Sequence, residues 1–332
     1  MVISKLNTRF IYWAIAFSIA GVLLYFSLRG LNWKQVGVTL SRANVAYIGV
    51  SLLIASFSLL MRAIRWGILL RAGAAVTLPT AFWATSAGYF GNNFLPARAG
   101  EFVRTVIVSA RTGLSKTFVL TTAFTERLAD AVTLVVLSSI VLLTLTVKPG
   151  WFQGAARPFA IVGLCGVACI GVLPRMENIW RAVIDRLPFP QQFRAKLQLI
   201  LEQILNGLRT LHDWRRFCGF AGLALVIWFS DAIGTIIVMR ALGLSISIPI
   251  AFLLLTGLGL SSALPATPGY VGIYQFVAVN VLVPFGFSRP DAIAFSLLAQ
   301  VMQYVLITFW GLLAFSRQRS LSLQSLRGQR AA

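Results

Sequence analysis

A polar decapeptide, GNNFLPARAG at residues 91–100, interrupts a strongly apolar stretch and is followed directly by Glu101. The side chains of Asn92, Asn93 and Arg98 can donate hydrogen bonds to an anion, and a broken helix frees backbone N–H groups that do the same. These residue types predict a site for a phosphate or a carboxylate. The alternative for the two asparagines is that they cap the backbone of the broken helix.

A second interruption, LPATPG at residues 264–269, repeats the L-P-A-x-x-G pattern of residues 95–100. Matched breaks in the two halves of a membrane transporter point to its binding site, although two unrelated helix-ending prolines would leave the same pattern. In each segment the second half-helix should begin just after the glycine, near Glu101 and Tyr270. Its unpaired N–H groups and positive dipole end would then face the middle of the membrane.

Four acidic residues lie in apolar surroundings, namely Glu101, Glu126, Asp130 and Asp231. Glu126 and Asp130 of TERLAD are four residues apart, so they share one helix face, with Arg127 beside them. A charge in the middle of a membrane helix costs about 2.5–3.5 kcal/mol on insertion scales, and therefore needs an arginine, a cavity or a proton. We expect these groups to balance charge or to carry protons; for Asp231 a structural ion pair or a helix–helix hydrogen bond is the alternative.

Two further pairs of residues complete the candidate set: an acid with an arginine, and two arginines. Glu101 and Arg104 are three residues apart, and we expect them to form an ion pair that orders the first broken segment. Arg62 and Arg65 share a face at the end of an apolar run. We expect these two arginines to be interfacial, since arginines at such positions usually extend to lipid headgroups.

The composition identifies the class of protein. Of 332 residues, 58% are hydrophobic and only 11% are charged, whereas soluble domains carry about 25% charged residues. The chain is therefore expected to be an integral membrane protein. Its net charge of +20 comes from basic residues between apolar runs, which is typical of loops that face anionic lipid, so nucleic acid is not expected as a partner.

Cofactors are not expected either. The three cysteines and single histidine have neither the number nor the spacing for a metal site or a disulfide framework. A G-x-x-x-x-G-K-[ST] motif is absent from the sequence, so ATP is not expected to drive the protein directly.

Stretches of roughly 20 apolar residues predict spanning helices. Six such runs occur, at 10–28, 44–61, 118–147, 158–174, 217–239 and 292–315. Two further apolar segments, 77–112 and 246–286, are broken by proline and glycine. The distribution of basic residues places both termini in the cytoplasm, although Arg29, Lys34 and Arg42 in a short outer loop oppose this orientation. The broken segments then become re-entrant hairpins that enter from opposite leaflets, as in an inverted repeat. The predicted fold class is an all-α polytopic membrane protein.

The expected domain organisation is simple. Residues 1–316 form a single transmembrane domain, and residues 317–332 form a basic cytoplasmic tail. Within the domain, residues 175–216 form a cytoplasmic linker. Leucines and isoleucines recur at helical intervals over 193–211, which predicts an amphipathic helix that lies on the inner membrane surface or packs on the helix bundle.

Four motifs together resemble one family: NNFLPARAGEFVR, TERLAD, LPATPGYVGIYQ and the RAIRW that ends the second apolar run. They are similar to the flippase-like family of the lysylphosphatidylglycerol synthase transmembrane region, and the resemblance covers nearly the whole chain. Members are the lipid-translocating half of aminoacyl-phosphatidylglycerol synthases, or stand-alone inner-membrane proteins of bacteria and archaea linked to lipid, hopanoid or glycolipid pathways. The motif positions implied here are Pro96, Arg98, Gly100, Glu101, Arg104, Glu126, Arg127, Asp130, Pro265, Pro268 and Gly269. Members often carry an acid where this chain has Gln275, so a proton-coupled role is not carried over to that position.

The expected function is translocation of an anionic, polyprenyl-phosphate or glycolipid-type lipid that supports cell-envelope lipid synthesis, by a non-enzymatic protein of the bacterial inner membrane. The predicted partners are the membrane lipid itself and a lipid-synthesis enzyme in the same membrane. No aminoacyl-transferase domain follows residue 316, so lysyl transfer is not expected. The predicted lipid-contacting residues are Asn92, Asn93, Pro96, Arg98, Gly100, Glu101, Arg104, Pro265, Pro268, Gly269, Tyr270 and Gln275.

Two alternatives from other classes stay open. The first is a membrane-embedded transferase acting on lipid headgroups, with Glu126 or Asp130 as general base, which the lack of a nucleophile–base pair disfavours. The second is a non-catalytic partner that stabilises a lipid-synthesis enzyme.

Overall fold

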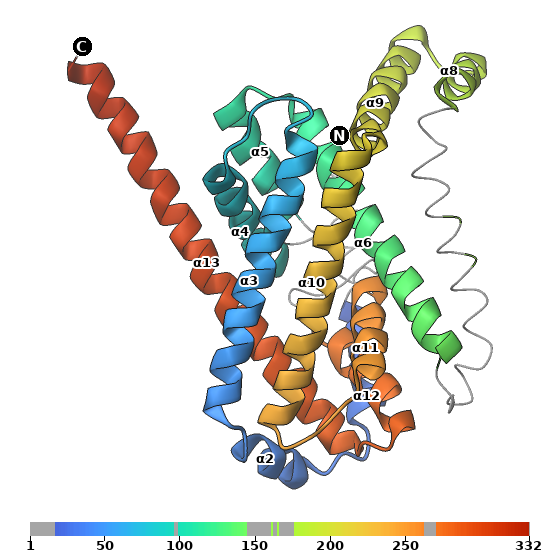
Figure 1. The fold of residues 1–332 in the computed structure, drawn as a ribbon, viewed down its shortest axis with the longest axis vertical. Coiled ribbons are helices and arrows are strands. Elements are labelled where there is room, and N and C mark those ends of the chain that lie inside the picture. The colour runs from blue at the N-terminus through green and yellow to red at the C-terminus, as the bar shows by residue number, and fades with distance from the viewer. Residues whose placement is uncertain are drawn as a thin grey trace. The chain divides into compact units, whose positions relative to one another are not determined.

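The computed structural model describes most of the chain, and the described residues form helices joined by turns, with no strand among them (Figure 1). The described residues are 17–95, 99–144, 161, 165, 176–261 and 270–331. Three helical segments are long and apolar enough to cross a membrane: α3 (Val45–Leu70), α10 (Trp214–Ala241) and the part Arg289–Arg317 of α13 (Arg289–Ala331). The predicted all-α class is thereby confirmed for the described residues, and three helices are candidates to span a membrane.

The bounds of the predicted spans agree only in part with those of the helices in the structure. The run 44–61 forms only the first part of α3, because the helix continues through both Arg62 and Arg65 to Leu70. The run 118–147 corresponds to α6 (Lys116–Thr144), and residues 317–331, predicted as a tail, continue α13. Of the first run, Phe17–Leu28 is an apolar helix. The run 158–174 falls outside the described residues except for Ile161 and Cys165.

Both broken segments are interrupted in the structure. α4 (Leu78–Phe94) ends before the first LPAxxG motif and α5 (Gly100–Thr112) begins at its glycine. α11 (Ile248–Ser261) ends before the second motif, and α12 (Ile273–Leu282) begins after it. The total of six spans, the re-entrant course of the two segments and their inverted symmetry stay predictions.

The chain divides into two compact units built from interleaved segments. The first contains residues 1–59, 83–104 and 230–332, and the second contains residues 60–82 and 105–229.

In the first unit, α12 is the centre of the packing. α11 lies against it so closely that a Cβ on Gly257 would be 2.7 Å from Val277. At the start of α12, Gly272 has a φ of +88°, and a Cβ there would lie 2.5 Å from the carbonyl oxygen of Ala20. On another side, α13 packs against α12 and against α2 (Trp33–Ser41). Glycine at 272 is therefore required both by backbone conformation and by close packing.

In the second unit, α6 packs against α9 (Gln191–Arg209), which also contacts α8 (Glu177–Arg186). The helix predicted over 193–211 is thus α9, and its Leu205 is buried. Packing on the bundle is therefore the alternative that the structure supports for this helix. The residues that could do chemistry in this unit lie on α6 and on the C-terminal part of α3.

Candidate functional site

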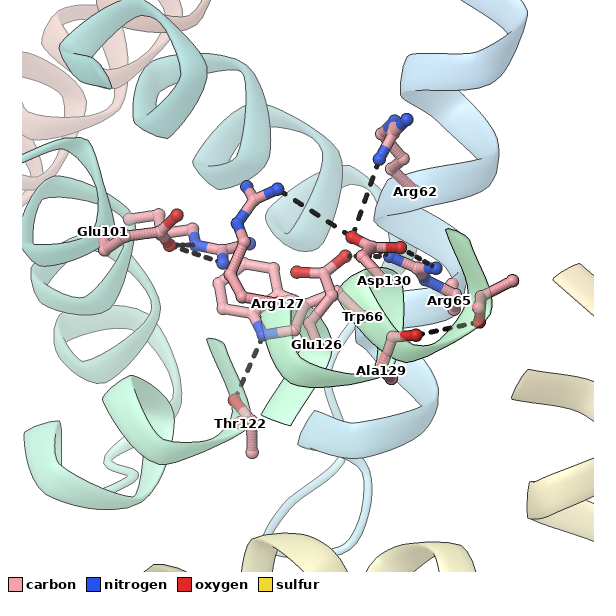
Figure 2. A network of polar contacts seen from close by, with 11 residues as sticks. Arg62, Arg65, Trp66, Glu101, Thr122, Glu126, Arg127, Ala129 and Asp130 are labelled. Atoms are coloured by element: carbon pink, nitrogen blue, oxygen red, sulfur yellow. Dashed lines mark hydrogen bonds and ion pairs between the residues drawn. The ribbon is translucent and has the colours of Figure 1, made fainter. Parts of the chain in front are cut away.

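Arg65 is the centre of a buried polar network in the second unit (Figure 2). Its Nη1 donates to Oδ1 of Asp130 at 2.6 Å and its Nη2 donates to Oδ2 of the same carboxylate at 3.0 Å. The Nη2 also donates to Oε1 of Glu126 at 3.1 Å. The Arg65 side chain has 0% of its surface exposed. A planar guanidinium fork matches a carboxylate in this two-bond geometry, which makes the pair strong and directional.

The local sequence explains why these groups meet. Glu126 and Asp130 are four residues apart on α6, so both carboxylates project from one face of that helix. Arg62 and Arg65 are three residues apart on α3 and share a face in the same way. Burying a lone carboxylate costs several kcal/mol, but pairing it with a hydrogen-bonded arginine offsets that cost.

Two further arginines approach the same acid. Nη1 of Arg62 lies 3.8 Å, and Nη1 of Arg127 lies 3.9 Å, from Oδ2 of Asp130. Their side chains are 12% and 25% exposed, whereas that of Arg65 is fully buried. Three guanidinium groups therefore approach the carboxylate of Asp130, and one of them, that of Arg65, also binds Glu126.

Aromatic residues support two of the arginines. The guanidinium carbon of Arg65 lies 5.0 Å from the ring centroid of Phe220, and that of Arg62 lies 5.1 Å from the ring of Trp228. Both distances allow a cation–π interaction. The sequence analysis missed these aromatic partners. Their spacing of eight residues, about two helical turns on α10, is the signal that could have indicated a shared face.

The neighbouring Trp66 fixes α3 against α6. Its indole Nε1–H donates to the hydroxyl of Thr122 at 3.1 Å (Figure 2). This hydroxyl donates in turn to the carbonyl of Val119. Trp66 and Thr122 are both fully buried. The RAIRW motif thus supplies Arg62 and Arg65 to the network and a tryptophan that holds the helix carrying them.

A second polar group lies in the first unit, where α4 and α5 meet. Oε2 of Glu101 accepts a hydrogen bond from Nε of Arg104 at 2.5 Å, which is the i, i+3 pair that the sequence predicts. Nδ2 of Asn92 donates to Oε1 of Glu101 at 3.3 Å. Asn93 is buried beside them in the chain, and neither its Nδ2 nor Oδ1 of Asn92 has a hydrogen-bond partner among the described residues.

Glycine makes this close approach of α4 and α5 possible. A Cβ on Gly100 would lie 1.8 Å from the carbonyl oxygen of Gly88, and a Cβ on Gly91 would lie 2.7 Å from the Cα of Gly100. No side chain fits at these distances. The two helices can pack antiparallel in this way only because all three contact positions are glycine.

The remaining predicted site residues are placed as follows. Tyr270 adopts a φ of +58°, a conformation that is uncommon for a bulky residue. Gln275 is buried, accepts a hydrogen bond from the backbone N–H of Gly272 and donates to Gln300, both at 2.8 Å. Asp231 is half-buried and its backbone carbonyl accepts a hydrogen bond from Thr235. The predicted residues outside the described part of the chain are Pro96, Arg98, Pro265, Pro268 and Gly269.

The expectation that Arg65 extends to lipid headgroups is wrong, because its side chain is completely buried between Glu126 and Asp130. Arg62 is also largely covered and points toward Asp130. Glu126 and Asp130 on α6 are the anionic partners of these arginines, in place of lipid headgroups. The sequence of α3 alone does not reveal them.

Metal ligation finds no support in the described residues, among which no three histidine, cysteine or acidic side chains group together. The chemistry of the network is therefore that of guanidinium and carboxylate groups: holding an anion, and exchanging one ion-pair partner for another.

Comparison with known proteins shows relatives in three archaea. The chain is 26% identical to Glycosyltransferase AglD of Haloferax volcanii over 216 residues, which is 56% of this chain but only 34% of that protein. It is 23% identical to a UPF0104 membrane protein of Pyrococcus horikoshii, covering 92% of this chain and 98% of the relative. A UPF0104 membrane protein of Methanothermobacter thermautotrophicus is 24% identical over 81% of this chain and 82% of its own length.

No solved structure matches the chain. The family described as "Lysylphosphatidylglycerol synthase TM region" matches residues 13–311, a range that contains the arginine network and both interrupted segments. The chain belongs to the family of the lysylphosphatidylglycerol synthase transmembrane region.

Proposed function

We propose that this protein translocates a lipid with a phosphate-bearing, anionic headgroup across the membrane in which it lies. The observation that carries the proposal is a network of ionised side chains on otherwise apolar helices, formed by Arg62, Arg65, Arg127, Glu126 and Asp130. Family membership and the long apolar helices support a role within the membrane.

Ionisable groups are expensive inside a bilayer, and those that occur in membrane helices commonly mark a pathway for a substrate or an ion. Arg62 and Arg127 keep part of their side chains exposed. A guanidinium group binds a phosphate in the same way as a carboxylate, so these side chains favour a site for an anionic headgroup.

The interrupted hairpin of α4 and α5 is the second part of the proposal. We propose that Arg98, together with the N–H groups at the start of α5, receives the headgroup phosphate, while the pair formed by Glu101 and Arg104 keeps the hairpin in shape. Asn93 is buried and has an unused donor among the described residues, and is well suited to bind a polar ligand. The corresponding segment around Pro265, Pro268 and Gly269 would contribute in the same way.

Reconstitution into liposomes tests this function. A fluorescently labelled phosphatidylglycerol is placed in both leaflets, and a membrane-impermeant reductant destroys the label in the outer one. A translocating protein exposes the inner pool, so fluorescence falls well below the level of protein-free vesicles. Lipids extracted afterwards should be chemically unchanged.

The same assay separates the two alternatives. A membrane-embedded headgroup transferase would yield a modified lipid when a donor is supplied; the similarity to Glycosyltransferase AglD is the reason to include this alternative. A non-catalytic partner of a lipid-synthesis enzyme would neither move nor modify the lipid. We propose the cytoplasmic membrane as the location, with both termini in the cytoplasm, on the basis of the basic loops.

A further inference from the structure

We infer that one face of α4 binds the hydroxyl groups of a lipid headgroup, so that the substrate is an anionic lipid whose phosphate carries a polyol such as glycerol or a sugar. Thr85, Asn92 and Asn93 form this polar face of α4. The inference deepens the proposed function and rests on it, because it names the headgroup that the protein would move.

Helical geometry places the three side chains of the polar face together. Asn92 follows Thr85 by seven residues and Asn93 follows it by eight, and these spacings return to the same side of an α-helix after two turns. At 1.5 Å per residue, the face extends over about 12 Å of the helix. All three residues belong to the first compact unit.

Other residues of α4 make its contacts with the neighbouring helices. The ring centroid of Phe90 lies 5.7 Å from that of Phe315 on α13. A Cβ on Gly91 would lie 2.7 Å from the Cα of Gly100 on α5. These contacts use an aromatic ring and glycines, so the packing of α4 does not by itself require the polar side chains.

Each side chain of the polar face has a buried polar atom without a hydrogen-bond partner among the described residues. These atoms are Oγ1 of Thr85, Oδ1 of Asn92 and Nδ2 of Asn93. Thr85 is only 1% exposed and Asn93 only 3%. Buried polar atoms in native proteins are nearly always hydrogen-bonded, because an unpaired one lowers stability. Three such atoms on one helix face therefore indicate a polar occupant.

The chemistry of the unpaired atoms decides which group fits them. Nδ2 of Asn93 only donates hydrogen bonds, Oδ1 of Asn92 only accepts them, and the hydroxyl of Thr85 does both. A phosphate oxygen only accepts and would leave Asn92 unpaired. An ammonium group only donates and would leave Asn93 unpaired. A hydroxyl group donates and accepts, so a polyol can satisfy the whole face.

The polar face adjoins the start of α5, where we propose that the phosphate binds. A Cβ on Gly100, the first residue of α5, would lie 2.6 Å from Oδ1 of Asn92. The hydrogen bond from Nδ2 of Asn92 to Glu101 fixes which end of the amide is the acceptor. In a polyol phospholipid a short carbon chain joins the hydroxyls to the phosphate, so both groups can be bound at once.

Binding measurements on the purified full-length protein in detergent test the polar face. The probes are dioctanoyl phosphatidylglycerol and dioctanoyl phosphatidylmethanol, which have the same charge and acyl chains but differ in that only the first has headgroup hydroxyls. The wild type should bind phosphatidylglycerol roughly tenfold more tightly, as expected for one or two additional hydrogen bonds. Equal affinities would mean that water alone occupies the polar face, and would overturn the inference.

Two apolar variants remove unpaired atoms with little change in side-chain size. Thr85→Val and Asn93→Leu should each weaken phosphatidylglycerol binding by roughly three- to tenfold and leave phosphatidylmethanol binding unchanged. Because each removes a buried unpaired group, neither should lower the melting temperature of the lipid-free protein. A purely structural role predicts the reverse, namely a lower melting temperature and equal losses for both lipids, and that result would refute the inference.

Two control variants match these changes. Asn280→Leu makes the same replacement as Asn93→Leu at an exposed position of α12. Arg111→Gln removes one positive charge from an exposed position at the end of α5. Both controls should keep the wild-type preference for phosphatidylglycerol, and its loss in either would show that the polar face is not the source of the preference.

The inference and the proposed function can fail separately in the liposome assay. A wild type that moves phosphatidylglycerol and phosphatidylmethanol equally, with no effect of Asn93→Leu, would refute the polyol assignment and leave translocation in place. A wild type that moves neither lipid, yet shows the binding preference and loses it in Asn93→Leu, would refute translocation and leave the polar face as a headgroup site.

Discussion

Arg65 and Asp130, 65 residues apart in the chain, form two hydrogen bonds of 2.6 and 3.0 Å in a buried site. This pair joins the C-terminal part of α3 to the middle of α6. It also sets the position of the carboxylate toward which Arg62 and Arg127 point. The network that we propose to act on lipid therefore depends on a pair that does not itself have to touch lipid.

Replacing Arg65 should be costly. Arg65→Met leaves Glu126 and Asp130 buried without their main partner, and breaking a buried pair in this way costs about 3–5 kcal/mol. Thermal unfolding in detergent should show a large drop in melting temperature relative to Arg111→Met. A melting temperature equal to that of the control would mean that the network does not stabilise the fold.

A triple variant separates stability from function. Arg65→Met combined with Glu126→Gln and Asp130→Asn removes the stranded charges, and neutral replacements of buried ion networks often restore stability. The triple variant should melt closer to the wild type than Arg65→Met does, yet translocate lipid poorly because Asp130 no longer orders Arg62 and Arg127. Full translocation by this variant would contradict a role for the network in transport.

The sequence predicted half of this network. TERLAD places two acids on one helix face through its spacing alone, so their need for a cationic partner could be inferred. The partner could not be identified, because Arg62 and Arg65 follow an apolar run in the manner of ordinary interfacial arginines. Only the packing of α3 on α6 shows that the side chain of Arg65 is buried within the protein. The contribution of Phe220 and Trp228 depends on the same packing.

The helix breaks were predictable for a different reason. Proline and glycine act locally on backbone geometry, so α4 ends before Pro96 and α5 starts at Gly100 as the motif indicates. The length of α3 was underestimated because the charge of Arg62 and Arg65 lowers local hydropathy. Their pairing offsets that penalty, and pairing between distant segments is invisible to a hydropathy window.

Gly100 should tolerate no side chain. Its Cβ would lie 1.8 Å from the carbonyl oxygen of Gly88, so Gly100→Ala must push α4 and α5 apart, and overpacking of this kind costs about 1–3 kcal/mol. Gly49→Ala in α3 is the matched control. Nothing lies within 4 Å of that Cβ, and alanine favours a helix over glycine. Thermal unfolding that ranks the two variants equally would contradict the close packing of the hairpin.

Acid should loosen the contact between α8 and α9. A hydrogen bond from Arg181 on the same helix lowers the pKa of Glu177 below its ordinary value, and the charge and hydrogen bond of Arg209 on α9 lower it further. The bond from Arg209 is the one that joins the two helices. A folded pKa below the unfolded one means that ionised Glu177 stabilises this contact at neutral pH. The contribution is lost as the pH falls from about 4.3, the usual glutamate value, through the lower folded pKa.

Hydrogen exchange over residues 177–209 is the measurement for this pH effect. Protection should decrease in acid, and Glu177→Gln should show the decreased protection already at neutral pH. Glu202→Gln is a fitting control, since Glu202 is more exposed and lies 3.8 Å from Arg181. Protection that is insensitive to both pH and Glu177→Gln would show that the ion pair does not hold the two helices together.

Cysteine labelling tests the inverted arrangement of the two hairpins. Cys165 and Cys218 are exposed, so all three native cysteines are first replaced by serine. Single cysteines at Ala110 and Gly286, both exposed positions, should then react with an impermeant maleimide from opposite faces, cytoplasmic and periplasmic respectively. Labelling of both from one face would rule out hairpins that enter from opposite leaflets.

The most direct test of the central claim is phosphatidylglycerol translocation in liposomes by three matched proteins: wild type, Arg62→Gln/Arg127→Gln and Arg111→Gln. Each is first shown to be folded and incorporated equally. We expect the wild type and Arg111→Gln to expose the inner-leaflet lipid at similar rates, and the double variant to approach protein-free vesicles. A wild type that moves no lipid would contradict the proposed function, and a double variant as fast as Arg111→Gln would contradict a role for Arg62 and Arg127 in it.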